Sequence, residues 1–272
     1  EKLQQWKEDR VENLKQPHGW LSLVGLNWLR KGENSIGSDD SNDVVLSHGP
    51  SHLGSIVLLP NNQLQFHPKE NNQLKANGEI FNDDIEIYAD SHATEPATAL
   101  TVDTFKFVVV ERGKFGVRIW DSKAQTRTGF EGLTYFPADE SKRVVAKFIP
   151  YDPVKMIPIV NVLGILTETP SPGRLDFVIG GQAYSIDALD DEEDYYIIFA
   201  DKTNGKTTYG PGRFIHTETK VDAKGEVVMD FNKAYNPPCA FTAYSTCSLP
   251  PRQNRLPVEI KAGEKKYGNS AY

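Results

Sequence analysis

The side chains with the most chemistry gather in the last third of the sequence. Residues 230–251 combine a carboxylate, amides, phenols and two thiols with four prolines. Proline fixes φ and disfavours helix in the residue before it, so this segment is expected to form a rigid, irregular loop. Rigid loops on a β scaffold commonly carry binding and catalytic residues.

A ligand pocket is one interpretation of this region. The polar side chains that could line the pocket are Arg213, Asp230, Asn232, Tyr235 and Asn236. The Arg213 guanidinium would contact an anion, and Glu264 is a candidate general acid or base. Asp230 and Glu264 would also suit a hydrolase with paired carboxylates, which requires the two groups to lie within about 10 Å of each other.

A structural role is the alternative for the same residues. Short polar side chains in turns commonly bond the backbone of their own loop, which would explain Asp230 and the two asparagines without a ligand. Arg213 could equally pair with a structural carboxylate. The sequence leaves both interpretations open.

Cys239 and Cys247 are the only cysteines, and seven residues separate them. A hairpin between them could join the sulfurs in a disulfide, and two structural thiols are the alternative. A zinc site needs four ligands, and the sequence contains neither C-x-x-C nor H-E-x-x-H. A nucleophilic cysteine needs a nearby base, and His216 is the only histidine in the second half of the chain. We therefore expect neither a metal nor a cofactor.

The elements that would position these groups are mostly short strands. Residues 2–15 form the clearest helical pattern, because their apolar side chains follow one stripe that ends at Pro17. Later apolar runs alternate with Gly, Pro and Asn turns, as in antiparallel sheets. Asn204-Gly205 predicts a hairpin turn with a return strand from Thr207. The expected strands fall in residues 20–29, 44–46, 56–59, 64–66, 105–110, 116–120, 143–149, 156–163 and 195–200.

The predicted fold is mainly β, with a short N-terminal helix and two antiparallel β units of sandwich or barrel type. We place the amphipathic helix in residues 1–18 and a sandwich-like unit in residues 19–132. The second β unit, which carries the proline-rich loop, occupies residues 133–272. A polar segment that holds Pro137 marks the boundary between the units.

Composition restricts the partners. Lys and Arg total 30 against 37 Asp and Glu, a net charge of −7, which argues against binding to a nucleic-acid backbone. No apolar run approaches the roughly 18 residues of a membrane span. The sequence begins with Glu1 instead of Met, which suggests that a signal peptide or lipid anchor has been removed. We therefore expect a periplasmic, cell-surface or secreted protein.

Residues 34–46, with Ser51-His52 after them, resemble the core of forkhead-associated domains, which are small β-sandwiches that bind phosphothreonine from their loops. That family has an arginine directly after its motif glycine, whereas Ser38 follows Gly37 here. Without the guanidinium the bidentate phosphate contact is missing. The segment therefore predicts a strand and a turn rather than phosphopeptide binding.

Several further motifs are spread along the chain, namely Gly19-Trp20-Leu21, Tyr151-Asp152-Pro153, Ser171-Pro172-Gly173, Gly212-Arg213-Phe214 and the stretches 230–239 and 247–251. Together they resemble the DUF1684 family of domains of unknown function. The resemblance extends from about Trp6 to Tyr267. It implies a bacterial protein that is exported or lipid-anchored, and it assigns no activity.

The leading functional hypothesis is an exported protein that binds a small ligand in a pocket of the C-terminal β unit, with a carbohydrate or a small anion as the ligand. One alternative is a hydrolase that uses Asp230 and Glu264 in the same pocket. Another is a structural or surface-interaction module.

Overall fold

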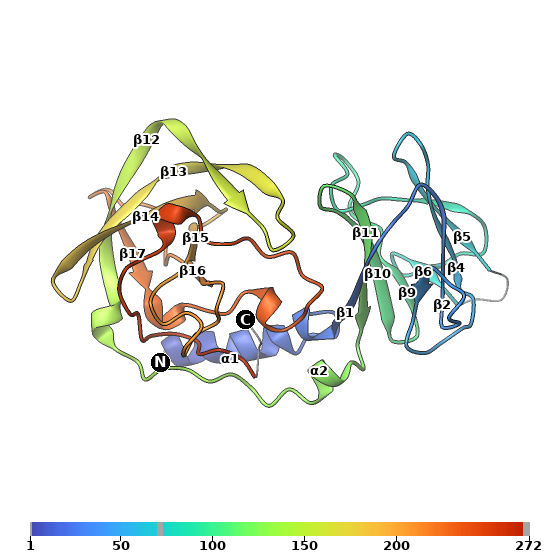
Figure 1. The fold of residues 1–272 in the computed structure, drawn as a ribbon, viewed down its shortest axis with the longest axis horizontal. Coiled ribbons are helices and arrows are strands. Elements are labelled where there is room, and N and C mark those ends of the chain that lie inside the picture. Colours follow the sequence, from blue (N-terminus) through green and yellow to red (C-terminus); the bar gives the residue numbers. More distant parts are fainter. Residues whose placement is uncertain (1, 70–72, 269–272) are drawn as a thin grey trace. The chain divides into compact units, whose positions relative to one another are not determined.

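The computed structural model describes residues 2–69 and 73–268, and β-strands dominate it, as predicted (Figure 1). The chain divides into two compact units. The N-terminal unit comprises Leu14–Phe130. The C-terminal unit comprises the chain from Glu131 onward together with the first helix up to Asn13, so it is discontinuous in the sequence.

Helix α1 (Lys2–Leu14) confirms the predicted N-terminal helix. Its sequence contains neither glycine nor proline, and Pro17 follows its last turn. Trp6 packs edge-on against Tyr135 of the same unit, with ring centroids 6.4 Å apart. Among the described residues, the helices are all too short or too polar to cross a membrane.

The N-terminal unit contains two mostly antiparallel sheets and the short helix α2 (Gln125–Thr128). The strands are β1 (Leu23–Trp28), β2 (Gly32–Gly37), β3 (Val44–Val45), β4 (Gly54–Leu58), β5 (Leu64–Pro68), β6 (Lys75–Ala76), β7 (Glu79–Ile80), β8 (Ile85–Ile87), β9 (Leu100–Val102), β10 (Phe105–Glu111) and β11 (Phe115–Asp121). One sheet has the order β1-β11-β10-β9-β6-β7, and the other has the order β3-β2-β4-β5-β8. Buried aliphatic and phenylalanine side chains from both sheets form one core.

The segment that resembles forkhead-associated domains includes β2, the turn after it and β3. Gly37 is required at the end of β2, because a Cβ there would lie 2.0 Å from the carbonyl oxygen of Ser51. Ser38 uses its hydroxyl to donate a hydrogen bond to the Gly49 carbonyl at 2.8 Å. The hydroxyl at the position of the family's arginine is therefore part of the turn itself.

The C-terminal unit is built on one six-stranded antiparallel sheet. Its strands are β12 (Arg143–Val160), β13 (Leu166–Ile179), β14 (Gln182–Asp190), β15 (Tyr195–Phe199), β16 (Arg213–His216) and β17 (Glu226–Asp230). Their order across the sheet is β16-β15-β14-β13-β12-β17. Side chains alternate along a strand. At the start of β12, Val144 and Ala146 therefore enter the core while Val145 and Lys147 face solvent.

Strands β12 and β13 differ from the prediction. The two strands predicted at 143–149 and 156–163 lie within the single strand β12, whose pairing with β13 shifts in register between Pro150 and Lys155. Strand β13 was not predicted, because Pro170, Pro172 and Gly173 are typical of breaks in strands. Pro172 falls at the register shift, where the regular ladder is interrupted.

The turn predicted at Asn204-Gly205 is present, and Gly205 has the positive φ of 76° that the turn requires. The predicted return strand from Thr207 is wrong. The backbone N–H groups of Thr207 and Thr208 both bond the Thr203 carbonyl, at 3.0 and 3.3 Å, so the chain winds into a further turn. The strand that returns beside β15 is β16, which begins at Arg213.

Candidate functional site

Arg213, the expected anion contact, is fully buried at the start of β16. Its Nη2 donates to Asp201 Oδ2 at 2.6 Å and to the Ile260 carbonyl at 2.9 Å, and its Nη1 donates to the Ala262 carbonyl. Burial lowers the pKa of the guanidinium. These contacts tie Arg213 to structural groups of its own unit.

Asp230 bonds its own turn, and Asn232 bonds the backbone of a neighbouring loop. Asp230 Oδ1 accepts from the backbone N–H of Asn232 at 3.0 Å and from its Nδ2 at 2.8 Å, which caps the short 3₁₀ turn Phe231–Lys233. The Asn232 amide in turn exchanges hydrogen bonds with the backbone of Asp139, at 3.0 and 2.9 Å. Both side chains therefore hold loop conformation.

Tyr235, Asn236 and Glu264 meet around Arg10 of α1. The Glu264 side chain has no exposed surface, and its two oxygens accept from Arg10 Nε at 2.9 Å and from the Asn236 backbone N–H at 2.8 Å. The Arg10 guanidinium carbon also lies 4.7 Å from the centroid of the Tyr235 ring. The sequence does not predict that Arg10 belongs to this group, because Arg10 lies 254 positions before Glu264.

The candidate site residues therefore fall into three groups, namely Arg213 alone, Asp230 with Asn232, and Tyr235 with Asn236 and Glu264. No direct contact among the described residues joins Arg213, Asp230 and Tyr235 to one another. The charge of Glu264 acts on Arg213 only through longer-range electrostatics. Asp230 and Glu264 each have their own hydrogen-bond partners, and no contact between described residues pairs the two carboxylates.

His216 extends the group around Tyr235. The Tyr235 hydroxyl lies 3.1 Å from His216 Nε2, and Asp194 Oδ1 lies 2.9 Å from His216 Nδ1. Burial raises the pKa of Tyr235, so the phenol keeps its proton over a wider pH range. Asp194 belongs to the acidic run at residues 190–194. This run is visible in the sequence, but it did not lead to a prediction that Asp194 lies beside His216.

Cys239 and Cys247 are neighbouring residues that both carry thiols. The Cys239 backbone N–H donates to Cys247 Sγ at 3.0 Å, and the Cys247 backbone N–H donates to Cys239 Sγ at 3.4 Å. The pKa of the Cys247 thiol is raised, mainly by a hydrogen bond with Cys239 and to a smaller extent by burial. A raised pKa disfavours the reactive thiolate. The arrangement is compatible with structural thiols and with a disulfide.

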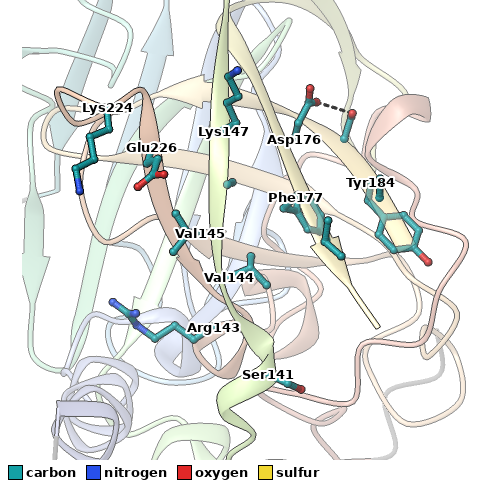
Figure 2. Close-up of a pocket in the computed structure, with 14 residues that line it drawn as sticks. Ser141, Arg143, Val144, Val145, Lys147, Asp176, Phe177, Tyr184, Lys224 and Glu226 are labelled. Atoms are coloured by element: carbon teal, nitrogen blue, oxygen red, sulfur yellow. Dashed lines mark hydrogen bonds between the residues drawn. The ribbon is translucent and has the colours of Figure 1, made fainter. Parts of the chain in front are cut away.

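The C-terminal unit also has a groove on the solvent side of its sheet (Figure 2). Its volume is about 830 Å³, and its lining comes from β12, β13, β14, β17 and the turns before β12 and β17. Val145 of β12 and Val178 of β13 lie in it with 55% and 57% of their surface exposed. Strand register was not available from the sequence, so this meeting of four strands could not be predicted.

A row of polar side chains crosses the groove. Lys147 on β12 is in register with Glu226 on β17 and with Asp176 on β13. Asp176 already accepts from Arg174 at 2.9 Å and from Ser185 at 2.6 Å, and the Arg174 hydrogen bond is the main cause that lowers its pKa.

Three cations line the groove, namely Arg143, Lys147 and Lys224 (Figure 2). Arg143 is engaged with Glu218 at 2.6 Å. The ammonium groups of Lys147 and Lys224 form no ion pair or hydrogen bond with another described residue. The groove therefore offers two positive groups beside exposed valine side chains.

Residues 128–265 match the model of the DUF1684 family, whose description is "Protein of unknown function". The chain belongs to this family. The match includes every residue of the groove, together with His216, Tyr235 and Glu264, and is narrower than the extent from Trp6 to Tyr267 expected from the sequence. The comparison with curated proteins gives no match.

Solved structures show partial likeness to this DUF1684 protein. An uncharacterised protein of Haloarcula marismortui, solved by NMR, is 27% identical, and the likeness covers 52% of this chain and 80% of that chain with a TM-score of 0.43. A crystal structure of Rad53 residues 1–466 with AMP-PNP is 10% identical, covering 81% of this chain and 51% of that chain with a TM-score of 0.17. TM-scores this low support no functional argument for the DUF1684 chain.

Proposed function

We propose that the C-terminal unit binds a small organic anion in the groove of Figure 2. One observation carries the proposal: the ammonium groups of Lys147 and Lys224 form no hydrogen bond or ion pair with another described residue, and both lysines line a hollow of about 830 Å³. Small-molecule sites typically have volumes of about 300–1,000 Å³ and combine apolar surface with a few polar groups. The groove has this combination.

The lining also favours a particular kind of anion. The carbon skeleton of a ligand would cover Val145 and Val178, while its carboxylate would pair with Lys147 or Lys224. Glu226, in register with Lys147, would repel a second negative charge and can accept a hydrogen bond from a hydroxyl. A hydroxylated monocarboxylate, such as a sugar acid, fits these three features best.

A hydrolase built on Asp230 and Glu264 has less support, because backbone groups and Arg10 occupy those carboxylates. Export of the protein, which the family resemblance implies, is retained as part of the proposal.

Calorimetric titration tests the proposal directly. Glucuronate should bind saturably and raise the melting temperature, while neutral glucose should do neither. Lys147→Met keeps the apolar stem and removes the charge, so it should weaken glucuronate binding at least fivefold. Raising the salt concentration should weaken binding as well, because the groove is open to solvent.

Lys202→Met is the matched control, because Lys202 is an exposed lysine of the same unit that does not line the groove. It should leave glucuronate binding within twofold of the unsubstituted protein. Equal weakening by both substitutions, or no saturable binding of any monocarboxylate in a panel that includes acetate and gluconate, would refute the groove as an anion site.

A further inference from the structure

A second cluster of chemically active side chains shares no residue with the groove. Asp191 and Asp194 lie on the turn between β14 and β15, and His216 is the last residue of β16. One ligand atom from each of the three side chains lies within 4.8 Å of the others. Within residues 2–69 and 73–268, no other three His, Cys, Asp or Glu side chains come together in this way.

Both carboxylates face the same nitrogen of the imidazole. His216 Nδ1 lies 2.9 Å from Asp194 Oδ1 and 3.5 Å from Asp191 Oδ2. A bare nitrogen lone pair facing two carboxylates would be repelled by them. The space between the three atoms therefore suits a positive group, which is either a proton on Nδ1 or a metal cation.

The other imidazole nitrogen is held by Tyr235. Its hydroxyl lies 3.1 Å from His216 Nε2 and can accept the Nε2–H, which leaves the lone pair on Nδ1 free for a metal. The Tyr235 backbone exchanges hydrogen bonds with Phe214 at 2.9 and 3.0 Å, so the phenol is fixed to the sheet. Histidines that ligate metals usually have their second nitrogen held by such a partner.

We propose that Asp191, Asp194 and His216 bind a divalent first-row transition-metal cation, such as Zn²⁺ or Mn²⁺. Carboxylate oxygen and imidazole nitrogen are ordinary ligands for both ions. The His216 side chain is 37% exposed and Asp191 is 48% exposed, so water can complete the coordination shell. Such positions open to solvent distinguish catalytic metal sites from closed structural ones.

Lys220, a cationic side chain beside this turn, has partners outside the cluster. Lys220 pairs with the Asp190 carboxylate and donates to the Asp191 backbone carbonyl. Its ammonium group forms no contact with the Asp191 or Asp194 carboxylate in the described structure. Lys220 therefore does not pair with either carboxylate of the cluster.

Titration of the full chain with Zn²⁺ alone and with Mn²⁺ alone, in a buffer that does not coordinate metals, tests this site. We expect saturable binding of one ion per chain by calorimetry. Asp194→Asn and His216→Gln should each weaken the dissociation constant at least tenfold. Tyr235→Phe, which keeps the ring and removes the hydroxyl, should weaken it about tenfold, as loss of an orienting partner does.

Glu192→Gln is the matched control, because it removes one side-chain charge from the same turn and keeps the backbone N–H that Glu192 donates to Asp191 Oδ1 at 2.9 Å. Its dissociation constant should stay within twofold of that of the unsubstituted protein. Absence of saturable one-to-one binding would overturn the proposal, and so would equal weakening by Glu192→Gln, since the turn would then attract cations by charge alone. Circular dichroism checks the fold of each variant, and Asp191→Asn on the exposed turn replaces any variant that does not fold.

Discussion

At the scale of single residues, Arg213 and Asp201 form a fully buried ion pair in the C-terminal unit. Neither side chain has exposed surface, and their contact atoms lie 2.6 Å apart. Arg213→Met should lower the free energy of unfolding by about 3–5 kcal/mol, because it leaves the Asp201 carboxylate buried without its cation. Urea denaturation at neutral pH measures the loss.

The control for this prediction is the solvent-exposed pair of Arg174 and Asp176, whose side chains are 42% and 34% exposed. Arg174→Met should cost no more than about 1 kcal/mol, as exposed ion pairs contribute little. If both substitutions cost the same, burial is not what makes Arg213 important.

Residue types alone did not reveal these partners. Arg213 contacts Asp201 and the carbonyls of Ile260 and Ala262, which are 12, 47 and 49 positions away. A guanidinium beside a chemically rich loop is equally suited to an anionic ligand and to buried carbonyls. Only the path of the backbone decides between these roles, and the sequence does not contain that path in readable form.

At the scale of elements, the Arg10 side chain links α1 to the proline-rich loop by hydrogen bonds. Arg10 donates to Glu264 at 2.9 Å and to the Asn236 carbonyl at 2.9 Å, and its guanidinium lies over the Tyr235 ring. Arg10→Met should destabilise the protein by about 3 kcal/mol, because the Glu264 carboxylate is then buried without its cation. This cost is measured as the decrease in the urea midpoint, provided that the slope of the unfolding free energy against urea concentration does not change.

The double variant Arg10→Met with Glu264→Gln separates charge from packing. A neutral amide at position 264 removes the buried charge, so the double variant should be more stable than Arg10→Met alone. If the two single costs simply add, the salt bridge is not the interaction that holds α1 in place.

Elements whose apolar residues recur at a regular spacing were predictable. Elements that contain proline or glycine, which usually interrupt strands, were not. The stripe of α1 follows from residue spacing, and the alternation of buried and partly buried side chains at the start of β10 likewise marks a strand. Strand β13 contains Pro170, Pro172 and Gly173, and its long pairing with β12 overrides these local signals. Tertiary pairing of this kind has no local signature.

At the scale of the whole molecule, the order of the sequence differs from the order of the contacts. The C-terminal unit takes in α1 up to Asn13, although the whole N-terminal unit lies between them in the chain. The groove likewise combines strands that are up to 83 positions apart, from Arg143 to Glu226. Local patterns therefore predicted the class of fold better than they predicted the site.

Charge is the property of the whole chain that is easiest to test. Carboxylates in both units have a pKa below their ordinary values of 3.8 for Asp and 4.5 for Glu, namely Asp39, Asp43, Asp121, Asp139, Asp176, Glu218, Asp222 and Glu259. For Glu218 the hydrogen bond from Arg143 is the main cause, and for Asp222 it is the backbone N–H of Glu226.

Because the folded state lowers these pKa values, it binds protons less readily than the unfolded state. The resulting stability is fully present above about pH 4.5 and is lost as the pH falls through the lowered values. The urea midpoint should therefore decrease as the pH is lowered from 7 to 2.5. Glu218→Gln should show a smaller fall, since one carboxylate with a lowered pKa is gone. A midpoint that rises below pH 4 would mean that repulsion among the acidic groups outweighs their hydrogen bonds.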